Sequence, residues 1–411
     1  MLIPNNLNKL AKKLIMQYSN SPKVLHKSEL LKIIKSSSKI AEENYKKIKA
    51  PKTCSKDFYI DYWIRETIQT AYTEKVFKNN LKINNNLLTK PITRFTHHLP
   101  LELQSAINKK LYERRLEERR IFWESLNLPL EKINSEYKNI IIARNQAARK
   151  QGYKNFLEQS LQIQNIPKEK YNWFIINQEK VIAYCNKTIT KEKLPRDFYS
   201  EFNIPCLICL LPNFPFKSLK EVSVYLSEEN KLINKYKSKL KINYTDHTNI
   251  RYIKETDSFC ININRNDNIR HQSLGLIHEL GHFHCFLKSF GKEINPLVTG
   301  KYVNEKCALE FQNQTLKNLS KALYKTYLGE YLLKLRRINF ELQIYDNPKS
   351  NLSRLYAESF NNCFLDANQK DNPLYLLDSG IILKPLASLA NLVSDTEIIF
   401  KEKGKENGLK A

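Results

Sequence analysis

The pentapeptide from His278 to His282, His-Glu-Leu-Gly-His, constrains this chain more than any other segment, because it specifies both a helix and a chemistry. Two histidines four residues apart project from the same side of an α-helix, where their imidazole nitrogens can hold one zinc ion. Glu279 points beside the metal and can take a proton from a water molecule that the metal activates. With eight histidines in 411 residues, chance would produce the pattern only about once in a hundred such chains.

The residues around this motif predict an amphipathic helix over 272–290, ended by Gly291. Its apolar residues recur at helical spacing and lie opposite the two histidines, at Leu276, Leu280, Phe283 and Leu287. His284 would face away from the pair and serve as packing or outer support for the site, and Cys285 would be a core residue. The alternative is a surface helix that carries two solvated histidines.

A catalytic zinc site needs a third protein ligand and one open position. No histidine follows His284, so a downstream ligand has to be a carboxylate. Glu305 is the first choice, because Asn304 can cap a new helix and place Glu305 in its first turn. Glu310 is the rival and would point off a different face of that helix; the remaining alternative is that neither is a ligand.

These residues resemble the thimet oligopeptidase / oligoendopeptidase F family of zinc peptidases, in His278-Glu-Leu-Gly-His-Phe-His-Cys and in the segment around Glu305. Three flanking segments are similar to family segments in the same order: a helix-turn-helix signature at 143–156, a strand at 258–263 that leads to the zinc helix and edges the substrate cleft, and a helix at 340–345. The resemblance covers roughly 130–390 and implies oligopeptide substrates that enter a channel.

The sequence also departs from the family pattern. Cys285 stands where the family usually has a third histidine, and the late segment that supplies a histidine and several tyrosines keeps only Tyr375. A donor to the developing oxyanion is usually worth about 3 kcal/mol. Tyr375 could fill that role alone or be an ordinary packed tyrosine, and both interpretations stay open.

Periodicity divides the chain into a helical N-terminal region (1–125), a zinc peptidase catalytic region (126–395) and a polar tail (396–411). Short strands are expected at 205–215, 221–226 and 259–263, forming a sheet whose edge a peptide could join, with Asn262 and Asn264 facing that edge. Helices are expected in the N-terminal region at 7–18, 29–48, 58–77 and 101–126, and after Glu305 at about 304–323, 325–346, 352–365 and 382–393.

Composition limits the other function classes. The net charge of +25 is spread along the chain and favours acidic peptides or anionic surfaces, but no motif for specific nucleic-acid binding accompanies it. No apolar run is long enough for a membrane span and the N-terminus lacks a signal-peptide pattern, so we expect a cytoplasmic protein. The eight scattered cysteines do not form a disulfide framework, and the pair at 206 and 209 is expected in the core.

The sequence therefore predicts a mainly α, multi-helix metallopeptidase fold with a small β-sheet next to the zinc-binding helix. One Zn²⁺ would be held by His278, His282 and Glu305, with Glu279 as general base and Tyr375 as a second catalytic residue. The predicted function is a zinc-dependent peptidase, of endopeptidase type, acting on oligopeptides. The first alternative is a noncatalytic family member that binds peptide or a protein partner; the second is a basic protein with structural zinc.

Overall fold

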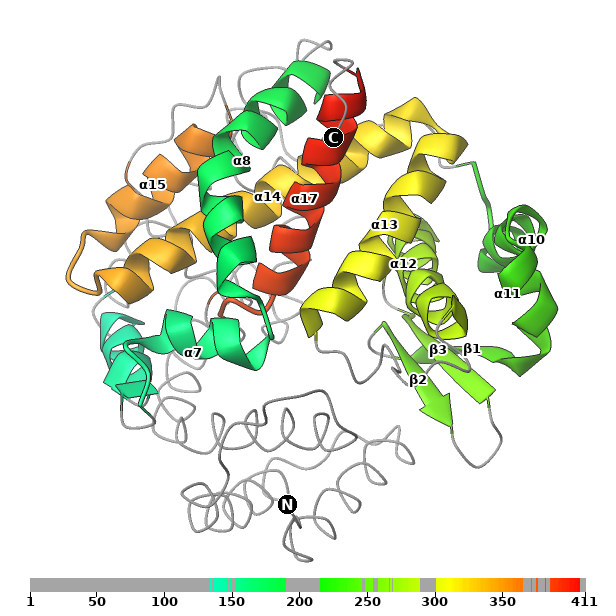
Figure 1. Ribbon diagram of the computed structural model, residues 1–411, viewed down its shortest axis with the longest axis horizontal. Coiled ribbons are helices and arrows are strands. Elements are labelled where there is room, and N and C mark those ends of the chain that lie inside the picture. The colour runs from blue at the N-terminus through cyan, green and yellow to red at the C-terminus, as the bar shows by residue number, and fades with distance from the viewer. Residues whose placement is uncertain are drawn as a thin grey trace, which may run out of the picture. The chain divides into compact units, whose positions relative to one another are not determined.

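A computed structural model describes residues 134–189, 215–288, 301–364 and 385–406, with short internal gaps, together with Asp371, Tyr375 and Ile381. This part of the chain is mainly helical with one small sheet, which confirms the predicted fold class (Figure 1). The predicted N-terminal helices and nearly all of the predicted strand at 205–215 lie outside the described residues. The chain divides into two compact units, and each is taken by itself.

The first unit contains residues 163–165 and the described part of 215–319. Its elements are α10 (Leu219–Glu229), α11 (Lys231–Tyr236), the short 3-10 helix η3 (Lys237–Lys239), β1 (Leu240–Thr245), β2 (Asn249–Ile253), β3 (Ser258–Asn264), α12 (Ile269–Lys288) and α13 (Lys301–Leu319). The sheet packs against α12, where Phe259 of β3 contacts the rings of Phe283 and Phe286.

The strand predicted at 259–263 is confirmed as β3, but its place in the sheet differs from the prediction. β3 is the central strand, parallel to β1 and antiparallel to β2. Asn262 and Asn264 therefore do not border a free edge: the Asn262 side chain donates to Asn249 Oδ1 over 2.7 Å. The outer edges of the described sheet belong to β1 and β2. A strand buried along almost its whole length is typical of a central strand, whose two faces are both covered.

The strand predicted at 221–226 is wrong, because this segment lies in α10. Ser218 caps the helix by accepting a hydrogen bond from the Glu221 backbone N–H. The Glu221 carboxylate in turn accepts the Lys217 backbone N–H over 2.9 Å, one residue before the cap, so Ser-x-x-Glu fixes the helix start in a variant of the capping box. Val222 and Leu226, one helical turn apart, are both buried.

The helices α12 and α13 lie in close contact, with α12 behind α13 in the view of Figure 1. Gly281 makes this possible: a Cβ at this position would lie 2.7 Å from the backbone oxygen of Ala308 and 2.9 Å from its Cα. A disulfide between Cys285 and Cys307 joins the same two helices, with a Cα–Cα distance of 6.1 Å. Cys285 is buried as predicted, but the sequence did not reveal its bonding partner.

The second unit contains residues 134–162 and 166–189 and the described part of 320–406. Its elements are a helical segment at 137–146, α7 (Phe156–Ile163), α8 (Lys168–Ile189), α14 (Lys321–Asp346), α15 (Leu352–Cys363) and α17 (Leu389–Glu406). The helix expected at 382–393 is confirmed only from residue 389. α17 then continues through most of the predicted polar tail, because Ile398 and Ile399 are buried.

The helix-turn-helix expected at 143–156 is present in this unit. Gly152 forms the turn with a φ of 88°, a conformation that glycine adopts without strain. The Asn145 side chain accepts the Phe156 backbone N–H and donates to the Tyr345 carbonyl oxygen. One asparagine thus fixes the start of α7 and ties the turn to α14.

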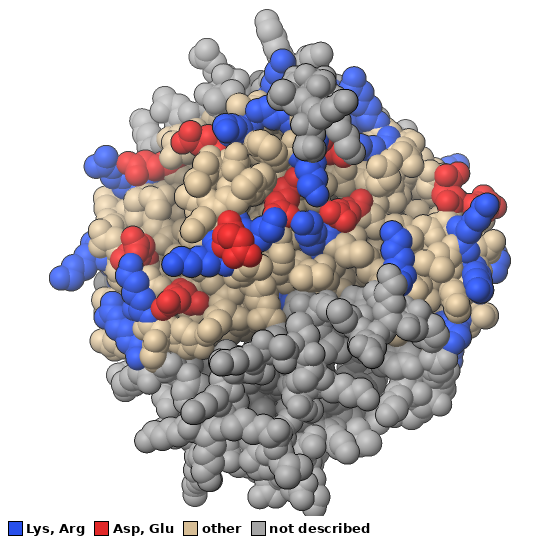
Figure 2. Space-filling view, in the orientation of Figure 1, with Lys and Arg blue, Asp and Glu red and all other residues tan. Residues whose placement is uncertain are grey.

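Charged side chains of both signs are interspersed over the described part of the face in Figure 2. The net positive charge is thus not gathered into one patch on this face, in line with its spread along the sequence. Among the described helices, none combines the length and apolar content that a membrane span requires.

We predict that Gly281→Ala lowers the free energy of unfolding by about 1–3 kcal/mol, because the added methyl group meets backbone atoms that cannot rotate away. Urea unfolding followed by circular dichroism measures the change. Gly329→Ala is the matched control: this glycine lies inside α14 with nothing within 4 Å of an added Cβ. The control should gain about 0.5–1 kcal/mol. Equal effects of the two substitutions would contradict the close helix contact.

Candidate metal centre

The three ligands predicted from the sequence lie together in the first unit. His278 and His282 lie one turn apart on α12, and Glu305 is the fifth residue of α13. Glu305 Oε2 lies 3.4 Å from His278 Nε2 and 3.8 Å from His282 Nε2. The ligand atoms of all three residues lie within 4.8 Å of one another. Glu310 is exposed and does not belong to this group.

Bonds of about 2.0–2.1 Å to a tetrahedral zinc place neighbouring ligand atoms about 3.3 Å apart. The two distances from Glu305 to the histidines, 3.4 and 3.8 Å, are close to this value, and the three ligand atoms need to draw together only slightly to bind one ion. Two imidazoles and one carboxylate are also the ligand set of catalytic zinc sites, which keep the fourth position for water or substrate. The residues present therefore fit a catalytic zinc ion.

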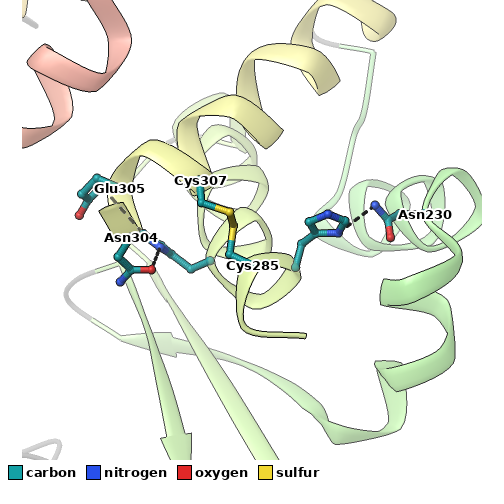
Figure 3. Close-up of a disulfide and its surroundings, with 7 residues drawn as sticks. Asn230, Cys285, Asn304, Glu305 and Cys307 are labelled. Carbon is teal, nitrogen blue, oxygen red and sulfur yellow. Dashed lines mark hydrogen bonds and ion pairs between the residues drawn. A yellow bond between two sulfur atoms is a disulfide. The ribbon is translucent and has the colours of Figure 1, made fainter. Parts of the chain in front are cut away.

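Two side-chain amides lie behind the histidines. Asn304 Oδ1 is 3.1 Å from His282 Nδ1, and Gln312 Oε1 is 3.1 Å from His278 Nδ1. Because an amide oxygen only accepts hydrogen bonds, each contact favours a proton on Nδ1, so that the neutral form of each imidazole presents its Nε2 lone pair to a metal. Figure 3 shows Asn304 and Glu305 side by side on α13.

The sequence analysis did not identify Asn304 and Gln312 as parts of the site. Asn304 was expected as a helix cap, but α13 begins at Lys301, so Asn304 lies inside the helix and its side chain is free to reach His282. Its position directly before the predicted ligand Glu305 could have indicated that it lies next to the metal site. Gln312 lies two helical turns beyond Asn304 and so on the same side of α13.

Glu279 is buried next to the ligand group, with 8% of its surface exposed. Its carboxylate accepts a hydrogen bond from the Ile250 backbone N–H of β2. Burial is the main reason that its pKa is raised to about 7; Glu305 adds to the rise, while His278 and the Ile250 N–H oppose it. A carboxylate with this pKa can both accept and release a proton near neutral pH.

Without a metal, the three ligand residues have very different pKa values. Burial by itself lowers the pKa of His278, but the hydrogen bond and charge of Glu305 outweigh it and raise the pKa to about 9. Burial and the neighbouring His278 charge lower the pKa of His282 to about 4. Burial would raise the pKa of Glu305, but the two histidines hold it at about 2. Near neutral pH the site thus holds one positive imidazole beside one carboxylate.

His284 lies away from the ligands. The Asn230 side chain donates to its Nδ1 over 3.1 Å, and its ring packs against Phe311 (Figure 3 shows Asn230). Asn230 also ends α10 and caps α11. His284 therefore connects these two helices to α12.

Tyr375 belongs to the second unit and is fully buried. Its ring contacts three other aromatic rings, those of Tyr137, Phe340 and Tyr356, and its hydroxyl donates to Asn134 Oδ1. These contacts favour the packing role. A catalytic role for Tyr375 stays a prediction.

Comparison with known proteins finds solved structures with a similar fold. No family model matches the chain, and no curated protein matches it. Among solved structures it resembles PZ peptidase A with inhibitor 2, with a TM-score of 0.54, 14% identity, and coverage of 98% of this chain and 76% of that chain. A protein assigned as oligoendopeptidase F gives a TM-score of 0.51 and 14% identity over 97% of this chain and 75% of that chain.

At this level of identity the likeness shows a shared fold. It is a fold that peptidases use, in line with the resemblance that the sequence carries around the histidine pair. The chemistry has to be argued from the site itself.

We predict that zinc binding releases about one proton per ion at pH 8, because His278 is protonated below its pKa of about 9 and must become neutral to bind. The apparent zinc affinity should rise about tenfold per pH unit from pH 7 and level off above pH 9. Calorimetry in buffers of different ionisation enthalpy counts the protons. A pH-independent affinity over this range, with no proton released, would contradict the charge state assigned to the site.

Proposed function

We propose that this protein is a zinc-dependent metallopeptidase that hydrolyses peptide bonds in oligopeptides, as an endopeptidase. The main support for the proposal is that the ligand atoms of His278, His282 and Glu305 lie close together. Glu279 lies buried beside them. The peptidase fold of the similar solved structures supports the same conclusion.

Zinc, when bound by the two histidines and Glu305, would supply Lewis-acid chemistry for the scissile carbonyl and for water. Glu279 is the general base: it takes a proton from the attacking water and later passes it to the leaving amine. Its surroundings suit both steps, because burial raises its pKa to about 7 and the Ile250 N–H fixes one carboxylate oxygen. Asn304 and Gln312 hold the imidazoles in the binding tautomer.

The sheet offers a place for the peptide backbone. The Glu279 carboxylate interacts with the backbone N–H of Ile250 in β2, which is an outer strand of the described sheet. The outer edge of β2 therefore borders the general base, and we assign it, in place of β3, as the edge that an extended substrate joins. Backbone hydrogen bonds to this edge would bind oligopeptides of varied sequence.

A noncatalytic protein of the same fold is the second candidate. Two observations favour it: no histidine follows His284, and the one late tyrosine expected to stabilise the oxyanion is buried and hydrogen-bonded. Such a protein would keep the zinc site and bind peptide without turnover.

We expect Glu279→Gln to lower the turnover of an internally quenched oligopeptide by about 10²–10⁴-fold, because the amide cannot take the proton. Zinc should stay at one equivalent, since Glu279 is not a ligand. His282→Ala should lose the zinc, measured by metal analysis of the dialysed protein. Full zinc in His282→Ala would refute the site. A wild-type protein with zinc but no activity on a peptide library would support the noncatalytic candidate.

Tyr375→Phe separates packing from catalysis. Because its hydroxyl bonds Asn134 inside an aromatic cluster, we expect a loss of about 1 kcal/mol in the free energy of unfolding. The activity of the folded variant should stay near the wild-type value. A fall in kcat of about 10²–10³-fold at unchanged stability would instead identify Tyr375 as the oxyanion donor.

A further inference from the structure

A disulfide joins the helix that carries both histidines to the helix that carries the carboxylate. Cys285 lies three residues after His282, and Cys307 lies two residues after Glu305. Figure 3 shows the sulfur–sulfur bond between the two helices, with Asn304 and Glu305 on the adjoining turn of α13. The covalent link is thus within one helical turn of ligands on both sides.

The position of Glu305 makes this link important for the site. Glu305 is the fifth residue of α13, close to the end of the helix, and helix ends fray. Asn304 and Glu305 reach the histidines only while this end stays against α12. Gly281 allows the backbone of Ala308 to come close to α12 near the same level of the helix pair. The disulfide is the covalent tie among the described contacts of the two helices.

We propose that the Cys285–Cys307 disulfide is a positioning element of the metal centre, so that reduction of this bond weakens zinc binding. The inference rests on the proposed zinc site. With the bond intact, Glu305 is held opposite the imidazoles before the metal arrives. With the bond broken, zinc binding must also order the start of α13, and the cost of that ordering lowers the affinity.

Cys285 is 2% exposed and Cys307 is half-buried, so a small reductant has to approach the bond from the side of Cys307. A water-soluble trialkylphosphine attacks one sulfur and supplies two electrons, and the S–S bond breaks. Water gives its oxygen to the phosphine and its protons to the sulfurs, so the products are one phosphine oxide and two thiols. Reduced protein and a variant without these cysteines should then behave alike.

The test measures the zinc dissociation constant by competition with a chromophoric chelator. Its samples are oxidised wild type, phosphine-reduced wild type after anaerobic removal of the reagent, and Cys285→Ala/Cys307→Ala. Supports around a metal site are typically worth about 10–100-fold in affinity, so we expect reduction and the double substitution each to weaken zinc binding by about tenfold or more. The phosphine should not change the double variant further. Peptide mapping without reductant confirms the bond in the oxidised sample.

Two further variants serve as controls. Cys363→Ala removes a buried cysteine that is not in the disulfide and should keep the wild-type zinc affinity. His282→Ala tests the metal site itself: if it binds zinc as tightly as wild type, the proposed site fails. If His282→Ala loses zinc while reduced wild type keeps the oxidised affinity, the site stands and the role of the disulfide is overturned. If the double variant does not fold, the zinc affinities of Cys307→Ala and of reduced wild type decide whether the disulfide matters. If the oxidised protein does not contain the bond, the proposal is also overturned.

Discussion

The close approach of α12 and α13 is the contact on which the candidate site depends. α12 alone supplies two imidazoles and a nearby carboxylate, which is an incomplete set for a catalytic zinc ion. Glu305 completes the set only because Gly281 lets the backbone of Ala308 come nearer than any side chain would allow. The amides of Asn304 and Gln312 arrive with the same helix and fix the imidazoles. One small residue thus brings together a ligand and two supporting groups.

Local pattern was enough to predict some of this structure. The helix that carries His278 and His282 and the strand β3 are encoded by short-range periodicity, and the order of His-Glu-x-x-His before a later glutamate indicated the ligands. Relations between distant segments were not readable in this way. The pairing of β3 with two strands, the Cys285–Cys307 bond and the amides behind the histidines each depend on which segments pack together. The wrong strand prediction at 221–226 has a local cause. The Ser218–Glu221 cap in the sequence indicated the helix α10, but the alternation of apolar residues was interpreted as a strand.

Electrostatics connect this packing to the chemistry. Burial pushes the pKa of Glu279 upward, while Glu305 keeps a low pKa because two imidazoles face it. The same site thus contains one carboxylate suited to proton transfer and one suited to metal binding, and the difference comes from their neighbours. β2 takes part through the Ile250 N–H, which links the edge of the sheet to the general base. Helix pair and sheet edge together form the arrangement on which the proposed zinc peptidase activity rests.

X-ray absorption at the zinc edge of the loaded protein tests the central claim most directly, because it reports which atoms surround the metal. The account predicts two imidazole nitrogens and oxygen ligands at about 2.0–2.1 Å, with one oxygen from a non-protein ligand, and no sulfur. The spectrum of Glu305→Gln should change in the oxygen contribution, while the imidazole signal stays. A sulfur ligand at about 2.3 Å, or a spectrum that does not change when Glu305 is replaced, would contradict the proposed centre.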